Sequence, residues 1–425
     1  MRHVIIGNGP AGVVAAETLR KHRAHDEIVL IGDEPMPPYS RMAIPYMLVG
    51  GIDERGTWLR KDPNHWDALR IRRVTGRVVT LATSPRRVSL SDGQSIDFDT
   101  CLIATGSTPV KPPVPGIDLA FVHPCWTMAN AHAIAQLAKP GARVLQMGAG
   151  FIGCIIMESL ALRGVKLTVV EMGDRMVPRM MGPGAGGMIR QWCERKGVTV
   201  YTGTRVEAIE PAAPVRARFS NGKSEEFDLV IQATGVRPAI GFLAGSDVKC
   251  LLGVLVDERM QTSVEGIYAA GDCAEAFDPA SQKTIVSAIQ PNAVDQGYAA
   301  AMNMAGRHAV QRGVTQINVL DTLGLISTSF GNWQGVPGGE HAEICDPANF
   351  KYLRLEFDRD RLVGTNSVGM TEHVGVMRGL VERGARLGEW KDRLLKDPTR
   401  LMEAYLATAQ AQEHWQGRAR GSARA

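Results

Sequence analysis

Three glycines, Gly7, Gly9 and Gly12, follow an apolar segment in the stretch VIIGNGPAGVVAAETL. In a dinucleotide-binding turn the first glycine allows a tight bend, the second lets the backbone approach a pyrophosphate, and the third lets the helix pack on the strand. Asp33 ends a second apolar segment about 20 residues beyond Gly12, the spacing expected of a carboxylate that reaches a ribose hydroxyl. These residues predict a dinucleotide site with its phosphates at a helix N-terminus.

A second stretch, VLQMGAGFIGCIIMESLALRG, repeats the pattern with Gly148, Gly150 and Gly153, and the following strand KLTVVE ends in Glu171. One such match is also typical of an ordinary glycine-rich turn, but two in one chain predict a protein that holds two dinucleotides. An acidic residue at this place favours an unphosphorylated ribose, so Glu171 favours NADH over NADPH. Arg175 follows closely and offers a cation that could meet a phosphate instead.

Each turn needs a strand before its glycines and a helix after them, so the two turns predict an α/β fold. At 425 residues the chain is long enough for about three domains. The loops STPVKPPVPG and ATGVRP are rich in proline and glycine, as expected where a chain crosses between domains.

Composition excludes several classes of function. Lys and Arg number 48 against 44 Asp and Glu, so a net charge of +4 gives no reason to expect nucleic acid or an anionic membrane as a partner. No apolar run is long enough to cross a bilayer. The first residues, MRHVIIGNG, enter an apolar strand without the regions of a signal peptide, which predicts a cytoplasmic protein.

The cysteines form no C-x-x-C pair. This odd, scattered set argues against a disulfide framework, a zinc site and a cysteine-ligated iron–sulfur cluster, and we expect no metal. The seven cysteines are Cys101, Cys125, Cys154, Cys193, Cys250, Cys273 and Cys345.

Four further phrases are CLIATGSTP at 101–109, VIQATGVRP at 230–238, GIYAAGDCAE at 266–275 and AIQPNAVDQGYAAAMNMAG at 288–306. With the two glycine turns they make the chain resemble the two-dinucleotide flavoproteins of the pyridine nucleotide-disulfide oxidoreductase superfamily. Within it, the chain is most similar to rubredoxin and ferredoxin reductases and to the flavin part of NADH-dependent nitrite reductases. KYLRLEFDRDRLVGTNSVG, at 351–369, is similar to strands of their small C-terminal domain.

This resemblance implies two Rossmann-like domains, with the NAD domain inserted into the FAD domain, and a small α+β C-terminal domain. The implied boundaries are 1–112 and 243–317 for the FAD domain, 113–242 for the NAD domain, and 318–425 for the C-terminal domain with a flexible tail. The resemblance also implies FAD and NAD as cofactors and a homodimer.

Residue roles follow from the same resemblance. The first turn with Asp33 would hold the adenosine and pyrophosphate of FAD, Arg41 would brace this cofactor, and Asp272 would bond its ribityl chain or a neighbouring group. The helix that begins near Pro291 would direct its positive end at the pyrimidine edge of the flavin. The full set of expected cofactor-binding residues is Gly7, Gly9, Pro10, Ala11, Gly12, Asp33, Arg41, Ala104, Thr105, Gly106, Gly148, Gly150, Phe151, Ile152, Gly153, Glu171, Gly235, Gly271, Asp272, Pro291, Asn292 and Ala293.

The sequence departs from its relatives where the flavin's reactive face is expected. In PPYSRMAIPY, Met42 stands where thiol-dependent relatives carry a redox cysteine, and a thioether cannot form a disulfide. Ferredoxin reductase-like relatives pair a lysine with a glutamate, and here Tyr46 and Ile155 take those places. Glu158, a helical turn beyond Ile155, is an alternative carboxylate. The catalytic residues are therefore open, with these four as flavin-facing candidates.

Three hypotheses follow. The first is an FAD-dependent NAD(P)H oxidoreductase that passes electrons from NADH to a small electron-transfer protein or an enzyme subunit without an active-site disulfide. The second is a flavoprotein electron-transfer subunit or redox-responsive interaction protein with weak or no NADH turnover, which the Tyr46 and Ile155 pair favours. The third, a disulfide or persulfide reductase, would require another cysteine near the flavin.

Overall fold

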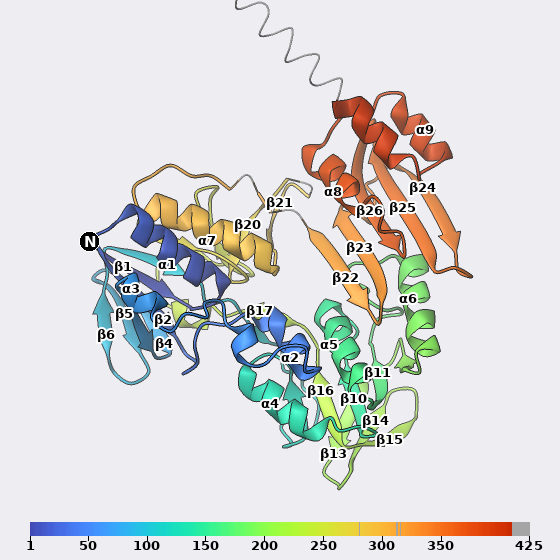
Figure 1. Ribbon diagram of the computed structural model, residues 1–425, viewed down its shortest axis with the longest axis horizontal. Coiled ribbons are helices and arrows are strands. Elements are labelled where there is room, and N and C mark those ends of the chain that lie inside the picture. The colour runs from blue at the N-terminus through green and yellow to red at the C-terminus, as the bar shows by residue number, and fades with distance from the viewer. Residues whose placement is uncertain (280, 312, 315, 410–425) are drawn as a thin grey trace, which may run out of the picture. The chain divides into compact units, whose positions relative to one another are not determined.

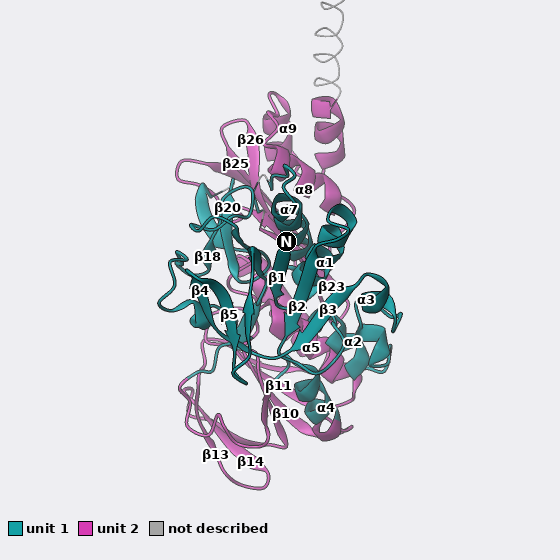
Figure 2. Cartoon of the chain, turned by 90° about the vertical axis from the view of Figure 1, so that its left-hand side faces the viewer, with its two compact units in different colours: residues 1–112, 124–135, 234–314 teal, residues 113–123, 136–233, 315–425 magenta. Residues whose placement is uncertain are grey.

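The computed structural model describes residues 1–279, 281–311, 313–314 and 316–409. The chain divides into two compact units (Figure 2). Unit 1 comprises residues 1–112, 124–135 and 234–314, and unit 2 comprises 113–123, 136–233 and 315–425. The predicted domain boundaries at 112, 242 and 317 stay a prediction.

Unit 1 is built on a five-stranded sheet in the order β19-β7-β1-β2-β3, with all neighbouring strands parallel. Its strands are β1 (Arg2–Ile6), β2 (Glu27–Gly32), β3 (Ile71–Thr75), β7 (Thr100–Ile103) and β19 (Ile267–Ala269). The three central strands are buried on both faces, which explains their continuous apolar sequences.

Two helices, α1 (Pro10–His22) and α7 (Gln290–Met304), pack together against one face of this sheet. Their close approach depends on a glycine, because a Cβ at Gly297 would lie 2.4 Å from the carbonyl oxygen of Ala11. This contact sets the first turn of α1 directly against the middle of α7.

The rest of unit 1 consists of short elements around this core. They are β4 (Val78–Thr83), β5 (Arg86–Leu90) and β6 (Ser95–Asp97); β8 (Ser107–Pro109) with β17 (Val236–Pro238); β18 (Val254–Leu255), β20 (Ala274–Asp278) and β21 (Lys283–Val286); α2 (Ile44–Leu48) and α3 (His65–Ala68); and the single turns η1 (Arg41–Ala43), η2 (Arg55–Thr57) and η3 (Gly241–Leu243). The chain passes between the units at β9 (Val122–Pro124) and α4 (Met128–Leu137).

Unit 2 holds the second glycine turn in a five-stranded sheet of order β12-β11-β10-β16-β9. Its elements are β10 (Arg143–Met147), α5 (Phe151–Leu162), β11 (Lys166–Val170), α6 (Pro183–Arg195), β12 (Thr199–Tyr201) and β16 (Leu229–Gln232). A three-stranded antiparallel sheet accompanies it, with β13 (Val206–Glu210), β14 (Val215–Phe219) and β15 (Ser224–Phe227).

The C-terminal part of unit 2 is an antiparallel sheet of order β22-β23-β26-β25-β24 (Figure 1). It contains β22 (Ile317–Thr322), β23 (Leu325–Gly331), β24 (Glu340–Asp346), β25 (Lys351–Asp358) and β26 (Arg361–Val368), followed by α8 (Val374–Arg383) and α9 (Trp390–Lys396). Asn366 ties this sheet to the second glycine-turn fold, since its side chain bonds the carbonyl oxygen of Met180 and the N–H of Gly182 at 2.9 Å each.

The predicted fold class, two Rossmann-like domains plus an α+β C-terminal domain, is confirmed. None of the helices within the described residues is both long and apolar enough to span a membrane.

Candidate functional site

The glycines of the first turn meet two different needs. Two of them avoid clashes within the protein, and the third keeps a helix N-terminus accessible. Gly7 has a φ of +114°, and a Cβ there would lie 2.1 Å from the carbonyl oxygen of Ala104. A Cβ at Gly12 would lie 1.9 Å from the carbonyl oxygen of Gly7. Gly9 precedes α1 without a side-chain cap, and nothing lies within 4 Å of a Cβ built on it. The outer glycines are thus required by the protein itself, whereas Gly9 leaves the N-terminus of α1, with Pro10 first, open to a ligand.

Gly271 lies in the turn after β19, close to the N-terminal turns of both α1 and α7. A Cβ on Gly271 would lie 3.4 Å from the Cβ of Ala293 in α7 and 3.5 Å from the Cβ of Ala11 in α1. The next residue, Asp272, accepts a hydrogen bond from the Ser107 hydroxyl at 2.7 Å. Burial raises the pKa of Asp272. The structure therefore gathers a carboxylate and two helix N-termini at one place.

The first turn of α7 contains Pro291 and is fixed by a buried amide. Asn292 Nδ2 donates to the Ser287 hydroxyl at 2.7 Å, and Asn292 is 7% exposed. The residue before the helix, Ile289, has no side-chain cap. The first N–H groups of α7 therefore have no side-chain acceptor at the N-cap, as the expected contact with a flavin requires.

Arg41 lies between two aromatic rings. Its guanidinium carbon is 5.6 Å from the ring centroid of Tyr39 and 5.4 Å from that of Trp126. Nη2 contacts the Glu34 carboxylate at 2.8 Å, and Nη1 donates to the Trp126 carbonyl at 2.6 Å. Trp126 in turn donates from Nε1 to the Ser107 carbonyl at 3.1 Å. Arg41 is thus anchored on the protein and close enough to Asp272 to oppose the rise of its pKa.

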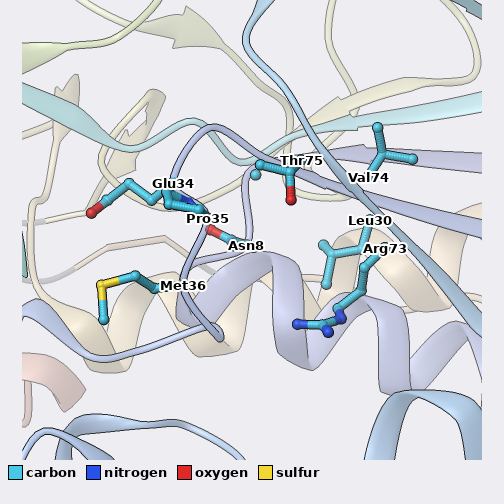
Figure 3. A pocket seen from close by; sticks show the side chains of 9 residues that line it. Asn8, Leu30, Glu34, Pro35, Met36, Arg73, Val74 and Thr75 are labelled. Carbon is cyan, nitrogen blue, oxygen red and sulfur yellow. The ribbon is translucent and has the colours of Figure 1, made fainter.

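The carboxyl ends of β1, β2 and β3 surround a hollow of about 140 Å³ (Figure 3). This volume is close to the ~150 Å³ of a cavity that holds one benzene ring.

Among the lining residues, Asn8, Glu34 and Arg73 are polar residues that the sequence prediction missed. The predicted ribose carboxylate, Asp33, is exposed and does not line the hollow, whereas its neighbour Glu34 does. The signal in the sequence that indicates Glu34 is its position as a second acidic residue directly after Asp33.

The two predicted ATG turns, at 104–106 and 233–235, form hydrogen bonds with neighbouring chain segments. The Thr105 hydroxyl donates to the Ala239 carbonyl at 2.9 Å, and the Ala239 N–H donates back to Gly106 at 2.9 Å. Gly235, with a φ of +101°, accepts from the Val110 N–H at 2.9 Å. Within the described contacts, these turns act as links between chain segments, and their contact with a cofactor stays a prediction.

The second glycine turn repeats the geometry of the first. Gly148 has a φ of +100°, and a Cβ at Gly153 would lie 2.6 Å from the carbonyl oxygen of Gly148. Nothing lies within 4 Å of a Cβ built on Gly150, which precedes α5 without a side-chain cap. Phe151 and Ile152 form the first turn of α5 and are half-buried. The second turn therefore also opens a helix N-terminus to a ligand.

Glu171 directly follows β11 (Lys166–Val170) and contacts the backbone of the second turn. Its Oε2 accepts from the Ala149 N–H at 2.7 Å and its Oε1 from the Gly173 N–H at 2.7 Å. Arg175, the alternative phosphate ligand, donates from Nε to the Met181 carbonyl at 2.8 Å and pairs with Asp174 at 2.7 Å. The Arg175 guanidinium is therefore already held by the protein, which favours NADH over NADPH.

The four flavin-facing candidates are divided between the units. Met42 in η1 and Tyr46 in α2 belong to unit 1 and are 45% and 64% exposed. Ile155 and Glu158 lie on α5 in unit 2 and are half-buried. Burial and the neighbouring Asp321 carboxylate raise the pKa of Glu158. Glu158 is thus near the C-terminal sheet of its own unit.

Most of the cysteine side chains are shielded from solvent. Five are buried, Cys250 is partly buried and Cys345 is exposed. Burial raises the pKa of Cys125 and of Cys193 to about 12, which suppresses the reactive thiolate. Among the described residues, no cluster of three or more metal-ligating side chains occurs.

The family model of the pyridine nucleotide-disulphide oxidoreductases matches residues 1–297. The chain belongs to this family. Members of the pyridine nucleotide-disulphide oxidoreductase family use FAD and NADH, and this chain is an NAD(P)H oxidoreductase with these two cofactors. The residues present fit them, since both turns leave a glycine-lined approach to an uncapped helix N-terminus.

Three similar members illustrate the range of this family. The epsilon subunit of an NADH-dependent phenylglyoxylate dehydrogenase from Aromatoleum evansii is 31% identical over 401 residues, 93% of this chain and 95% of that one. A ferredoxin–NAD(+) reductase subunit of a benzene 1,2-dioxygenase system from Pseudomonas putida is 32% identical over 272 residues, 64% of this chain and 66% of that one. The structure of an NAD-dependent persulfide reductase from A. fulgidus has a TM-score of 0.85 at 28% identity and covers 92% of this chain and 78% of that one.

Proposed function

We propose that this oxidoreductase takes hydride from NADH and passes electrons through FAD to an external acceptor protein or partner subunit, without an active-site disulfide. FAD supplies the chemistry that connects a two-electron donor with a one-electron acceptor. The chain's own part is to hold the two dinucleotides at the two glycine turns.

The observation that carries this proposal is the thiol-free segment from 37 to 46. Met42 occupies the place of the redox cysteine, and its thioether cannot cycle through a disulfide. Five of the seven cysteines are buried, and burial raises the pKa of the Cys101, Cys125 and Cys154 thiols. Electrons that leave the flavin would therefore go directly to an external acceptor.

Similar proteins support a protein acceptor. One is named as a ferredoxin–NAD(+) reductase subunit and another as a subunit of an NADH-dependent dehydrogenase. By analogy, we propose a small iron–sulfur or rubredoxin-like protein, or a catalytic partner subunit, as acceptor. A homodimer and a cytoplasmic location complete the proposal.

The decisive experiment is an anaerobic titration of the FAD-loaded protein with NADH, followed by the visible absorption of the flavin in a stopped-flow instrument. We expect rapid bleaching, because the proposed NADH site at the second turn carries Glu171, while Arg175 is already held by Asp174 and the Met181 carbonyl. A sample that dithionite bleaches and NADH does not would contradict the proposal.

A second candidate is an electron-transfer subunit or redox-responsive interaction protein with little NADH turnover of its own. Two observations favour it: Tyr46 and Ile155 stand where, by resemblance, ferredoxin reductase-like relatives carry a charged pair, and the epsilon subunit of the phenylglyoxylate dehydrogenase matches over 93% of this chain. It predicts a stoichiometric partner on purification and no bleaching by NADH alone. Steady NADH consumption with a diffusible carrier would weigh against it.

Alkylation of the accessible thiols is expected to leave NADH turnover with an artificial electron acceptor within about twofold of the untreated protein. The reason is that Cys345 is the exposed cysteine among the described residues and lies in the C-terminal sheet. Turnover before and after iodoacetamide treatment, with mass spectrometry to count the modified thiols, measures this. Loss of activity in step with Cys250 or Cys345 modification would restore the disulfide or persulfide reductase.

A further inference from the structure

One peptide of the second glycine turn is held from both sides. Gln146 Nε2 donates to the Gly148 carbonyl at 2.9 Å, and the Ala149 N–H donates to Glu171 Oε2 at 2.7 Å. The Gly148 C=O and the Ala149 N–H belong to the same planar peptide. The Gly173 N–H, 2.7 Å from Glu171 Oε1, holds the Glu171 carboxylate in turn. These bonds fix the orientation of the Gly148–Ala149 peptide, which we call the clamped peptide.

The burial of Gln146 at this position costs free energy of folding. Its side chain is fully buried, and Oε1 has no hydrogen-bond partner within the described part of the chain. Such an unpaired buried acceptor is destabilising. Exchanging the amide O and N would not help, because an oxygen would then face the Gly148 carbonyl oxygen.

The first turn shows that the fold itself does not need this amide. Ile5 stands two residues before Gly7, the place that Gln146 has before Gly148, and Ile5 packs in the apolar core. Room for the longer amide comes from Gly153, since a Cβ there would lie 3.0 Å from Gln146 Nε2. An apolar side chain therefore suffices for a strand beneath a glycine turn, and Gln146 adds a donor to the turn.

The clamped peptide leads directly to the open end of α5. The Ala149 carbonyl accepts from the Val177 N–H at 2.9 Å, so the next peptide is also held by its carbonyl. Its N–H belongs to Gly150, the residue whose Cβ position is open. Fixing both peptides sets the direction of the Gly150 N–H and of the first N–H groups of α5, which are the groups that bind a pyrophosphate.

We infer that Gln146 is a positioning residue for NADH: it orients the Gly148–Ala149 peptide, and so pre-organises the N-terminus of α5 for the pyrophosphate. This inference rests on the proposed assignment of the second turn to NADH. Pre-organisation acts on affinity, because the free protein then has less orientation to lose on binding.

The test is Gln146→Met in the FAD-loaded protein. The expected dissociation constant for NAD+, measured by calorimetry, rises about three- to tenfold, the worth of one lost hydrogen bond. The limiting rate of flavin bleaching at saturating NADH stays within about twofold, and FAD content stays at the wild-type level. The melting temperature stays close to that of the wild type, because removal of the unpaired buried Oε1 offsets loss of the donor to the Gly148 carbonyl. Thr168→Val, which removes another buried polar group on the adjacent strand β11, serves as matched control with unchanged NAD+ affinity.

Unchanged NAD+ affinity in Gln146→Met would overturn the inference. A lower melting temperature with parallel loss of FAD would also overturn it, since that pattern marks a purely structural residue. Calorimetry with NAD+ needs no hydride transfer. An unbleached wild-type flavin would therefore contradict the proposed function, while the clamp would still be judged by the binding constants.

Discussion

FAD retention is expected to fall roughly 10- to 100-fold when Asp272 is replaced by alanine, the worth of a lost hydrogen bond to a charged group. Asp272 follows Gly271, whose Cβ position lies 3.4 Å from Ala293 and 3.5 Å from Ala11 at the two helix N-termini. In the proposed FAD site, the Asp272 carboxylate would accept hydrogen bonds from the ribityl chain or from a neighbouring group. Burial raises the pKa of Asp272, because removing a carboxylate from water costs free energy, and the hydrogen bond from Ser107 offsets part of this cost.

Asp272→Asn is the matched variant, because it keeps the shape and an acceptor for Ser107 but removes the charge. We expect FAD affinity to fall to a level between wild type and Asp272→Ala, and the apoprotein to unfold at or above the wild-type temperature. FAD content by absorbance after gel filtration, and melting curves of the apoproteins, measure both effects. Wild-type FAD content in both variants would refute the assigned role.

The ratio of kcat/KM for NADH over NADPH is expected to fall roughly 100-fold or more in Glu171→Arg, because a carboxylate that we propose to accept from the ribose gives way to a cation that would meet a phosphate. The wild-type protein has no such cation ready, since Arg175 is held by Asp174 and the Met181 carbonyl. Steady-state rates with both nucleotides and one artificial acceptor give the ratio.

Glu171 also supports the turn, and the controls must separate the two roles. Glu171→Arg removes the acceptor of the Ala149 and Gly173 N–H groups, so NADPH activity should stay below the wild-type activity with NADH. Glu171→Gln keeps one acceptor and loses the charge, so it should weaken NADH without favouring NADPH. If both variants discriminate between NADH and NADPH as the wild type does, Glu171 is not at a ribose.

The sequence by itself determined the two glycine turns and the fold class. Gly7 and Gly148 adopt positive φ angles, and Gly12 and Gly153 leave no space for a Cβ, so the chain signals these turns with a residue type that nothing else can replace. The strands before the turns are buried on both faces, so they read as apolar runs. Local backbone geometry and burial can therefore be predicted directly from residue types and their order in the sequence.

The tertiary structure alone decided which polar side chains serve the turns. Glu34 lines the hollow with Asn8 and Arg73, whereas the adjacent Asp33 is exposed, because the direction in which the chain leaves β2 sets where neighbouring side chains point. The contact of Asp33 with a ribose stays a prediction. Gln146 looked like an ordinary residue of an apolar strand, yet its amide holds the Gly148 carbonyl. Such roles depend on hydrogen bonds between side chains and distant backbone groups, whose geometry exists only once the sheet and helices have packed.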